Sequence, residues 1–201
     1  MRRDITTAER LGAFSDAMIA VIITIMVLEL KAPDDPKLTA ILSLWPTLVS
    51  YVVSYLFIAI IWINHHHLLH FVHAASPRLI WINFAHLFLV SLLPFTTAWM
   101  ARTGLASLPV AIYAAIFVLI NCVYLFFEHE SLVQADAAAM PVHTRRLARR
   151  RSLAGLTIFT LASLVALLEP LVGFAFICVA LILYLRPEFF TRRSERHHHA
   201  N

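Results

Sequence analysis

The sequence predicts an all-α, polytopic membrane protein with six transmembrane helices in one chain, and its composition is the first reason. Of the 201 residues, 60% are hydrophobic and only 14% are charged, and the mean hydropathy is +0.77. A soluble domain is about half apolar and about a quarter charged. The composition therefore excludes a disordered chain, a disulfide-rich secreted module and most soluble enzyme folds.

The second reason is that six apolar stretches are near the length of a membrane-spanning helix, which is roughly 17–25 residues. They are approximately Leu11–Leu30, Leu44–Ile63, Leu79–Ala101, Val110–Phe127, Leu153–Leu168 and Leu171–Leu185. Polar and proline- or glycine-containing segments separate the first four stretches. The last two are short and meet at Glu169-Pro170, which we interpret as a tight turn because proline cannot continue a helix.

The third reason is the distribution of basic residues. With a cytoplasmic N-terminus, thirteen of the sixteen Lys and Arg residues lie on the cytoplasmic side, where such residues are enriched in membrane proteins. The other side carries only Lys31, Lys37 and Arg102. We therefore expect both termini in the cytoplasm, one transmembrane domain over residues 1–190, and a disordered polar tail over residues 191–201. The sequence has no internal repeat, so an axial pore would need several copies of the chain.

The first apolar stretch carries a carboxylate near its start. Phe14-Ser15-Asp16 lies inside a helix of lipid-spanning length, where ionisable groups are costly and usually face protein or water. Alternatively, Asp16 stabilises the start of the helix through the helix dipole. Arg10 precedes Asp16 by six residues, which is about 120° around a helix. The two cannot form a same-face pair, so we expect each to find its partner on another helix.

Ala17, Val21, Thr24 and Leu28 share one helical face, because they are spaced at i, i+4, i+7 and i+11. We call these four residues the seam. Several copies around an axis would stack apolar rings at Val21 and Leu28 with a hydroxyl ring at Thr24. Apolar constrictions gate pores by dewetting, and hydroxyl groups replace part of an ion's hydration shell. The alternative is a packing stripe in which Thr24 bonds to a carbonyl one turn earlier, and spacing alone favours it.

The end of the second stretch is rich in histidine. Four residues there have a spacing that can hold zinc or iron: His66, His67, His70 and His73. A metal site also needs fixed second-shell partners, usually with carboxylates or cysteines nearby, and these are distant in the sequence. We therefore expect no metal. The topology instead brings this segment to the end of the molecule where Arg10 and Asp16 lie, so these two charged residues can find partners there. The candidate partners are His65 or a neighbour, Asn64, Asn83 and His86.

The pattern Arg10-x-x-x-Phe14-Ser15-Asp16 at the start of six spans resembles the signature of the transmembrane protein 175 family of potassium-permeable channels. Trp62-x-x-His65 and the segment 91–95, Ser-Leu-Leu-Pro-Phe, are also similar to that family. The resemblance covers about residues 8–186. It implies a homotetramer in which the first helix of each subunit lines the pore, without the usual Thr-Val-Gly-Tyr-Gly filter.

The resemblance also assigns roles to the seam. Counted from the motif aspartate, the family's apolar constriction falls on Val21, its threonine layer on Thr24 and the next apolar ring on Leu28. Val21 is shorter than the leucine or isoleucine that is usual at the constriction, and would leave a wider neck. The remaining motif residues, Arg10, Phe14, Ser15, Asp16, Trp62 and His65, would tie the pore helix to its neighbours.

We therefore expect a passive potassium-permeable channel in a prokaryotic plasma membrane. It would be no enzyme and have no cofactor, and its partners would be potassium ions, the lipid bilayer and further copies of the chain, with no nucleic acid. Three alternatives stay open. The first is a proton-coupled carrier that uses Asp16 and the histidines of the second span. The second is an intramembrane metalloprotein at those histidines, and the third is a scaffold without transport.

Overall fold

The structure is a computed structural model that describes the backbone of residues 7–72, 74–134 and 142–198. Side chains are described over the same ranges except for residues 142–145, 147–148 and 186–198. Helices make up nearly all of these residues, which confirms the all-α class. They are α1 (Thr7–Leu28), α2 (Leu38–Ser43), α3 (Trp45–Leu69), α4 (Pro77–Ser91), α5 (Leu93–Arg102), α6 (Ser107–Gln134), α7 (Val142–Ala166) and α8 (Pro170–His198).

Six long helical segments occur where six spans were expected, if α4 and α5 are counted together. Four of them are long and apolar enough to cross a membrane: Thr7–Leu28, Trp45–Leu69, Pro77–Arg102 and Ser107–Gln134. α8 contributes a shorter apolar segment, Pro170–Leu185. α7 begins with an arginine-rich stretch, which lowers its mean hydropathy. Six membrane crossings therefore stay a prediction, as does the cytoplasmic location of the termini.

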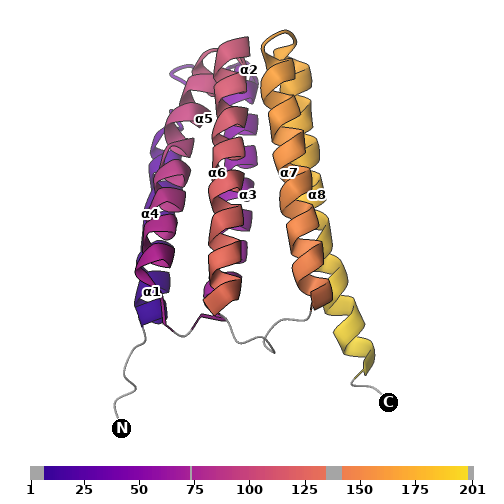
Figure 1. Ribbon diagram of the computed structural model, residues 1–201. Helices are drawn as coiled ribbons and strands as arrows, with labels where there is room; N and C mark the ends of the chain where they lie inside the picture. Colours follow the sequence, from indigo (N-terminus) through magenta and orange to yellow (C-terminus); the bar gives the residue numbers. More distant parts are fainter. Residues whose placement is uncertain (1–6, 73, 135–141, 199–201) are drawn as a thin grey trace.

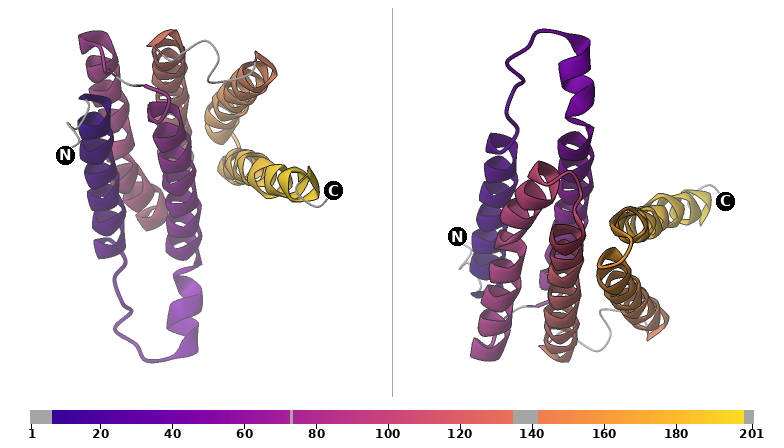
Figure 2. Two further views of the ribbon diagram at one scale, coloured as in Figure 1. Left: turned by 90° about the horizontal axis from the view of Figure 1, so that it is seen from below. Right: turned by 90° about the horizontal axis from the view of Figure 1, so that it is seen from above.

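The long helices run side by side in one bundle (Figure 1). α1 begins and α8 ends at the same end of the molecule, which is the arrangement that an even number of crossings requires. α7 packs against α6 and α8. Seen along the bundle, α7 and α8 form a hairpin to one side of the other helices, and α1 lies on the opposite side (Figure 2).

The third expected span is two helices, which the sequence analysis did not anticipate. α4 ends at Ser91 and α5 begins at Leu93, directly before Pro94. Proline has no amide hydrogen and its ring clashes with the preceding turn, so the helical hydrogen bonds are interrupted there. The amide of Leu92 donates instead to the carbonyl of Leu89, at 3.2 Å, in a tighter turn. The break changes the direction of the chain just beside α1.

The expected turn at Glu169-Pro170 is confirmed. α7 ends at Ala166, and the amide of Glu169 donates to the carbonyl of Val165 at 2.8 Å before α8 begins at Pro170. Gly173 allows the two helices to approach closely, since a Cβ there would collide with Ala166. The backbone of α8 is helical to His198, whereas we expected disorder from residue 191. Charged residues such as arginine and glutamate are adequate helix formers, so the helix can continue beyond its apolar part.

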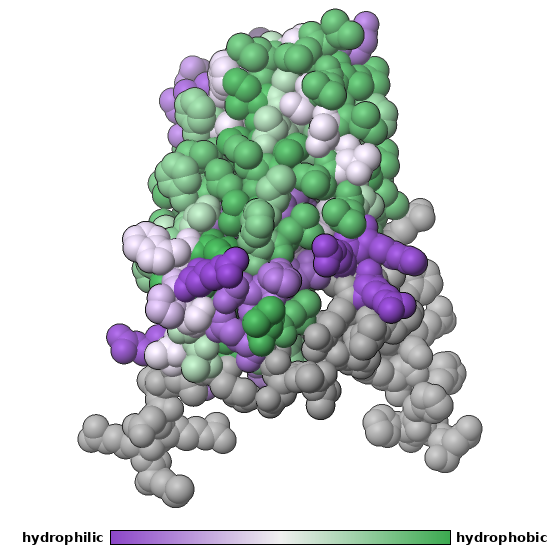
Figure 3. Space-filling model, viewed as in Figure 1, coloured by the Kyte–Doolittle hydropathy of each residue, from purple (hydrophilic) through white to green (hydrophobic). Residues whose placement is uncertain are grey.

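The core of the bundle is aromatic at its centre. Phe57 of α3 lies 4.6 Å from Phe117 of α6, and Phe117 stacks on Phe159 of α7 at 4.9 Å between ring centroids. All three rings are buried. On the face that Figure 3 shows, the surface is apolar over its upper part, and hydrophilic residues gather across its lower part. An exposed apolar surface of this extent must be covered by lipid or by other protein.

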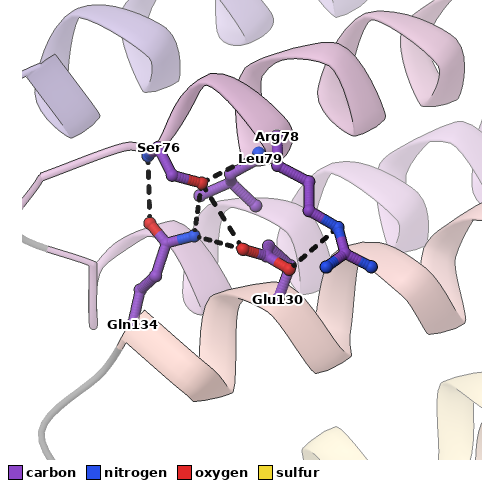
Figure 4. Close-up of polar contacts among 5 residues, drawn as sticks. All are labelled: Ser76, Arg78, Leu79, Glu130 and Gln134. Carbon is purple, nitrogen blue, oxygen red and sulfur yellow. Dashed lines mark hydrogen bonds and ion pairs between the residues drawn. The ribbon is translucent and has the colours of Figure 1, made fainter.

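A polar cluster fixes the start of α4 against the end of α6 (Figure 4). Gln134 accepts a hydrogen bond from the amide of Ser76 at 3.0 Å and donates one to its hydroxyl oxygen at 2.7 Å. The same hydroxyl oxygen caps α4 by accepting from the amide of Leu79 at 3.1 Å. Arg78 forms an ion pair with Glu130 at 3.4 Å. α4 is thereby held in the position from which it contacts α1.

Candidate functional site

α1 has one face turned to the bundle and one turned away from it. Its buried residues are Ala8, Leu11, Ser15, Ile19, Ile22 and Met26. The four seam residues all lie on the exposed face, where Val21 is 52% exposed and Leu28 is 78% exposed. The seam expected from spacing is therefore one continuous surface, and it does not pack against the chain's own helices.

Thr24 is the single polar residue of α1 between Ala17 and Leu28. Its hydroxyl group donates a hydrogen bond to the carbonyl oxygen of Val21 at 2.7 Å. This is the bond that the packing alternative requires. The bond uses the hydroxyl hydrogen and leaves the oxygen with an acceptor position, because a hydroxyl carries one donor and two acceptor sites. The observed contact is consequently compatible with both interpretations of Thr24.

Asp16 finds its partners on α3. The indole Nε1 of Trp62 donates to Asp16 Oδ1 at 2.8 Å, and Nδ1 of His66 lies 3.7 Å from Oδ2. The rings of Trp62 and His66 stack at 5.3 Å. This confirms the expectation that Asp16 pairs with another helix. Arg10 differs: it is exposed, and within the described residues its side chain makes no ion pair or hydrogen bond.

Ser15 and His65 belong to a second, fully buried network. The Ser15 hydroxyl donates to the carbonyl of Leu11 at 2.9 Å and accepts from Nδ2 of Asn83 at 3.0 Å. The side-chain oxygen of Asn83 lies 2.6 Å from Nε2 of His65, which donates to it. Asn83 therefore connects the two motif residues and joins α1 to α3 through α4. The sequence analysis placed Asn83 in this region, but could not identify it as the connecting residue.

The described histidines of α3 pack against aromatic side chains. Among the described residues, no group of three or more His, Cys, Asp or Glu side chains could hold a metal ion. His67 packs edge-on against Phe71, and His65 stacks on Phe127 at 4.7 Å. His73, one of the four candidate ligands, lies outside the described residues. Phe14 of the motif packs against Phe84 of α4 at 5.4 Å.

Two contacts between helices were missed by sequence reasoning. The end of α1 is joined to the end of α5 by an ion pair between Glu29 and Arg102. In the apolar interior, the Ser54 hydroxyl lies 2.8 Å from Thr97 Oγ1 and 2.7 Å from the hydroxyl of Tyr113. The signal for the second contact was a hydroxyl residue in each of three apolar stretches, which alone does not identify partners.

Residues 10–94 match the family model for the endosomal/lysosomal potassium channel TMEM175. This segment contains the whole seam and every motif residue of the two networks. The structure is similar to the crystal structure of a lysosomal potassium-selective channel TMEM175 homolog from Chamaesiphon minutus. The TM-score is 0.78 at 25% identity, over 88% of this chain and 95% of that chain. Over this segment and in its fold, the chain is similar to the TMEM175 family.

Two relatives extend this similarity. The chain is 28% identical to a potassium channel of Chryseobacterium sp. (strain P1-3) over 182 residues, which are 90% of this chain and 94% of that relative. It is 33% identical to a potassium channel of Chamaesiphon minutus over 124 residues, 57% of this chain and 61% of that relative. Both relatives are named as potassium channels, which agrees with the expectation that this chain is no enzyme.

Proposed function

We propose that this chain is a potassium-permeable channel in which α1 of each of four copies lines a central pore. The observation that carries the proposal is the division of α1 into two faces. Ser15 and Asp16 anchor one side of the helix to α3 and α4, and the seam on the other side is exposed. A helix held firmly from one side can present the opposite side to an axis.

The seam supplies the features that an ion path needs. Val21 and Leu28 provide apolar rings at two heights, and Thr24 lies between them with an oxygen that can accept. A cation that passes such a layer exchanges part of its hydration shell for hydroxyl oxygens. The shorter side chain of Val21 leaves a wider neck than leucine would, so we propose moderate rather than strict selectivity for potassium over sodium.

The number of copies comes from the family resemblance. The single chain leaves large apolar side chains exposed beside the seam, among them Ile25 and Phe95, and a groove of about 560 Å³ runs between α1 and α5. Contact with a second copy would cover these residues. The relatives from Chryseobacterium and Chamaesiphon minutus support a location in a prokaryotic plasma membrane.

Planar-bilayer recording of the purified protein under bi-ionic potassium and sodium conditions tests the proposal. We expect single-channel steps, a reversal potential that favours potassium, and a changed permeability ratio in Val21→Ala and Thr24→Ala. Leu168→Ala is the matched control, because Leu168 is 85% exposed between α7 and α8, which are not packed against α1. Unchanged conductance and selectivity in both seam variants would contradict the assignment of the pore.

The carrier alternative retains one supporting observation, because Asp16 and His66 are close and partly exposed. It requires saturable flux that moves protons with the substrate and gives no single-channel steps. The metalloprotein alternative requires a stoichiometric metal in the purified protein. Elemental analysis decides it, with His67→Ala and His70→Ala as the variants that would lose the metal.

A further inference from the structure

A partly open cavity of about 80 Å³ lies between the helices of the chain, away from the seam. Residues of α3, α4, α6, α7 and α8 line it, and no described residue of α1 does so. One water molecule needs about 10–15 Å³ measured in this way, so the cavity could hold about five to eight waters. It could equally hold one compact organic molecule of similar size, whereas a long acyl chain would extend beyond it.

One part of the cavity is aromatic and apolar. Phe57, Phe117 and Phe159, the stacked rings of the core, form its wall together with Ile60 and Ile120. Surfaces of this kind are filled poorly by water, which would lose hydrogen bonds there. They suit a flat apolar ring, because aromatic rings pack favourably at offset or edge-on angles.

The other part is polar and carries a cation. Arg151 lies over the ring of Tyr184, with its guanidinium carbon 6.0 Å from the ring centroid, and donates to the Tyr184 carbonyl at 3.4 Å. The Tyr184 hydroxyl donates to Asn121 at 3.3 Å. No aspartate or glutamate is among the described residues that line the cavity. The lining therefore combines one fixed positive charge with several hydrogen-bonding groups.

His86 is a buried polar side chain beside the cavity whose ring nitrogens have no hydrogen-bond partner among the described residues. The side chain lines the cavity and is fully buried. Asn64 of α3 also lines the cavity and is half-buried. Buried polar groups normally have partners, so the hydrogen-bonding capacity of His86 is unused when the cavity is empty.

We propose that this cavity binds a small aromatic carboxylate. The carboxylate would pair with Arg151, whose planar guanidinium matches two carboxylate oxygens, and the ring would lie among the three phenylalanines. The volume of the cavity suits a molecule of roughly benzoate size. The site is separate from the seam, so it would be present whether or not α1 lines a pore.

Equilibrium binding of benzoate to the purified full-length chain in detergent tests the proposal, by titration calorimetry with saturation-transfer NMR as a second readout. We expect saturable binding that Arg151→Gln weakens at least about tenfold, because a charge-assisted hydrogen bond is lost. Arg151→Lys should retain part of the binding. Arg149→Gln is the matched control, since Arg149 is exposed on the same helix.

Ile120→Phe fills the cavity without touching the charge, and should weaken binding to a similar degree with Arg151 intact. If thermal unfolding shows that Arg151→Gln does not fold, the binding measured with Ile120→Phe tests the proposal instead. Benzyl alcohol, which has the ring without the charge, should bind at least about tenfold more weakly than benzoate. Absence of saturable binding, equal binding of both compounds, or full binding in Ile120→Phe would overturn the proposal. None of these readouts depends on ion flux.

Discussion

The indole nitrogen of Trp62 donates a hydrogen bond to Asp16 at 2.8 Å, and His66 stacks on the same indole while approaching the same carboxylate. One charged residue of α1 is therefore held by two aromatic residues of α3. Because Asp16 precedes Ala17, the first residue of the seam, this contact helps to fix how the seam is turned about the axis of α1. Several variants follow from this geometry.

Asp16→Ala removes the acceptor of the Trp62 hydrogen bond. The Asp16 side chain is 38% exposed, so we expect a loss of only about 1 kcal/mol in the free energy of unfolding. Asp16→Asn keeps an accepting oxygen and should lose less. Thermal unfolding of the detergent-solubilised protein measures both. Asp34→Ala, in the exposed loop after α1, is the control, and an equal effect at both sites would show that the contact contributes nothing.

Asn83→Leu should be more damaging, although it preserves the size of the side chain. It leaves the buried Nε2 of His65 without a partner and the Ser15 hydroxyl with only its bond to the Leu11 carbonyl. An unpaired buried group costs about 1–3 kcal/mol and a lost hydrogen bond about 1 kcal/mol, so we expect a loss of about 2–4 kcal/mol. Chemical denaturation in mixed micelles measures it. If Asn83→Leu lowers the free energy of unfolding less than Asp16→Ala does, the buried network contributes little to stability.

Thr24→Val replaces the hydroxyl with a methyl group of similar shape. We expect the permeability ratio of potassium to sodium to fall by about two- to tenfold, the loss of one hydrogen-bond-like ligand per subunit. Thr24→Ser restores the oxygen and should restore most of the ratio. Reversal potentials under bi-ionic conditions measure the change. An unchanged ratio of potassium to sodium permeability in Thr24→Val would mean that the Thr24 hydroxyl does not contact the ion and serves only its hydrogen bond to the Val21 carbonyl.

Ser54 and Tyr113 should show a measurable interaction energy, because their hydroxyls meet at 2.7 Å inside the bundle. Hydrogen bonds between membrane helices average about 0.6 kcal/mol and reach about 1.7 kcal/mol. We expect a double-mutant cycle with Ser54→Ala and Tyr113→Phe to fall in that range. Ser107→Ala, at the start of α6, serves with Tyr113→Phe as the uncoupled pair. Additive effects for Ser54 and Tyr113 would mean that the contact contributes no stability.

Much of the fold could be predicted from the sequence, because a membrane imposes a minimum length on each apolar stretch. The helices α1, α3 and α6 follow from their hydropathy, and the turn at Glu169-Pro170 follows from the chemistry of proline. The division of the third span at Leu92 was harder, since Pro94 in a transmembrane helix often only bends it. The sequence contained the proline but did not indicate how sharply the chain would turn.

The candidate site was predictable to a similar degree. Helical spacing alone places the seam residues together, and the charge of Asp16 demands a partner. The identity of that partner was not predictable, because Trp62 and His66 are distant in sequence and several polar residues competed for the role. The connecting position of Asn83 likewise results from the packing of α4. That packing depends on the contact between Ser76 and Gln134, which holds the start of α4 against the end of α6.

Cysteine accessibility along α1 tests the central claim most directly. In a background where Cys122 and Cys178 are replaced by alanine, Thr24→Cys and Val21→Cys are treated with a membrane-impermeant, positively charged methanethiosulfonate during recording. The account predicts that the current is blocked at these seam positions and is unaffected at Leu168→Cys. Unblocked current at both seam positions would contradict a pore lined by α1, if mass spectrometry also shows that the reagent has not modified the two thiols.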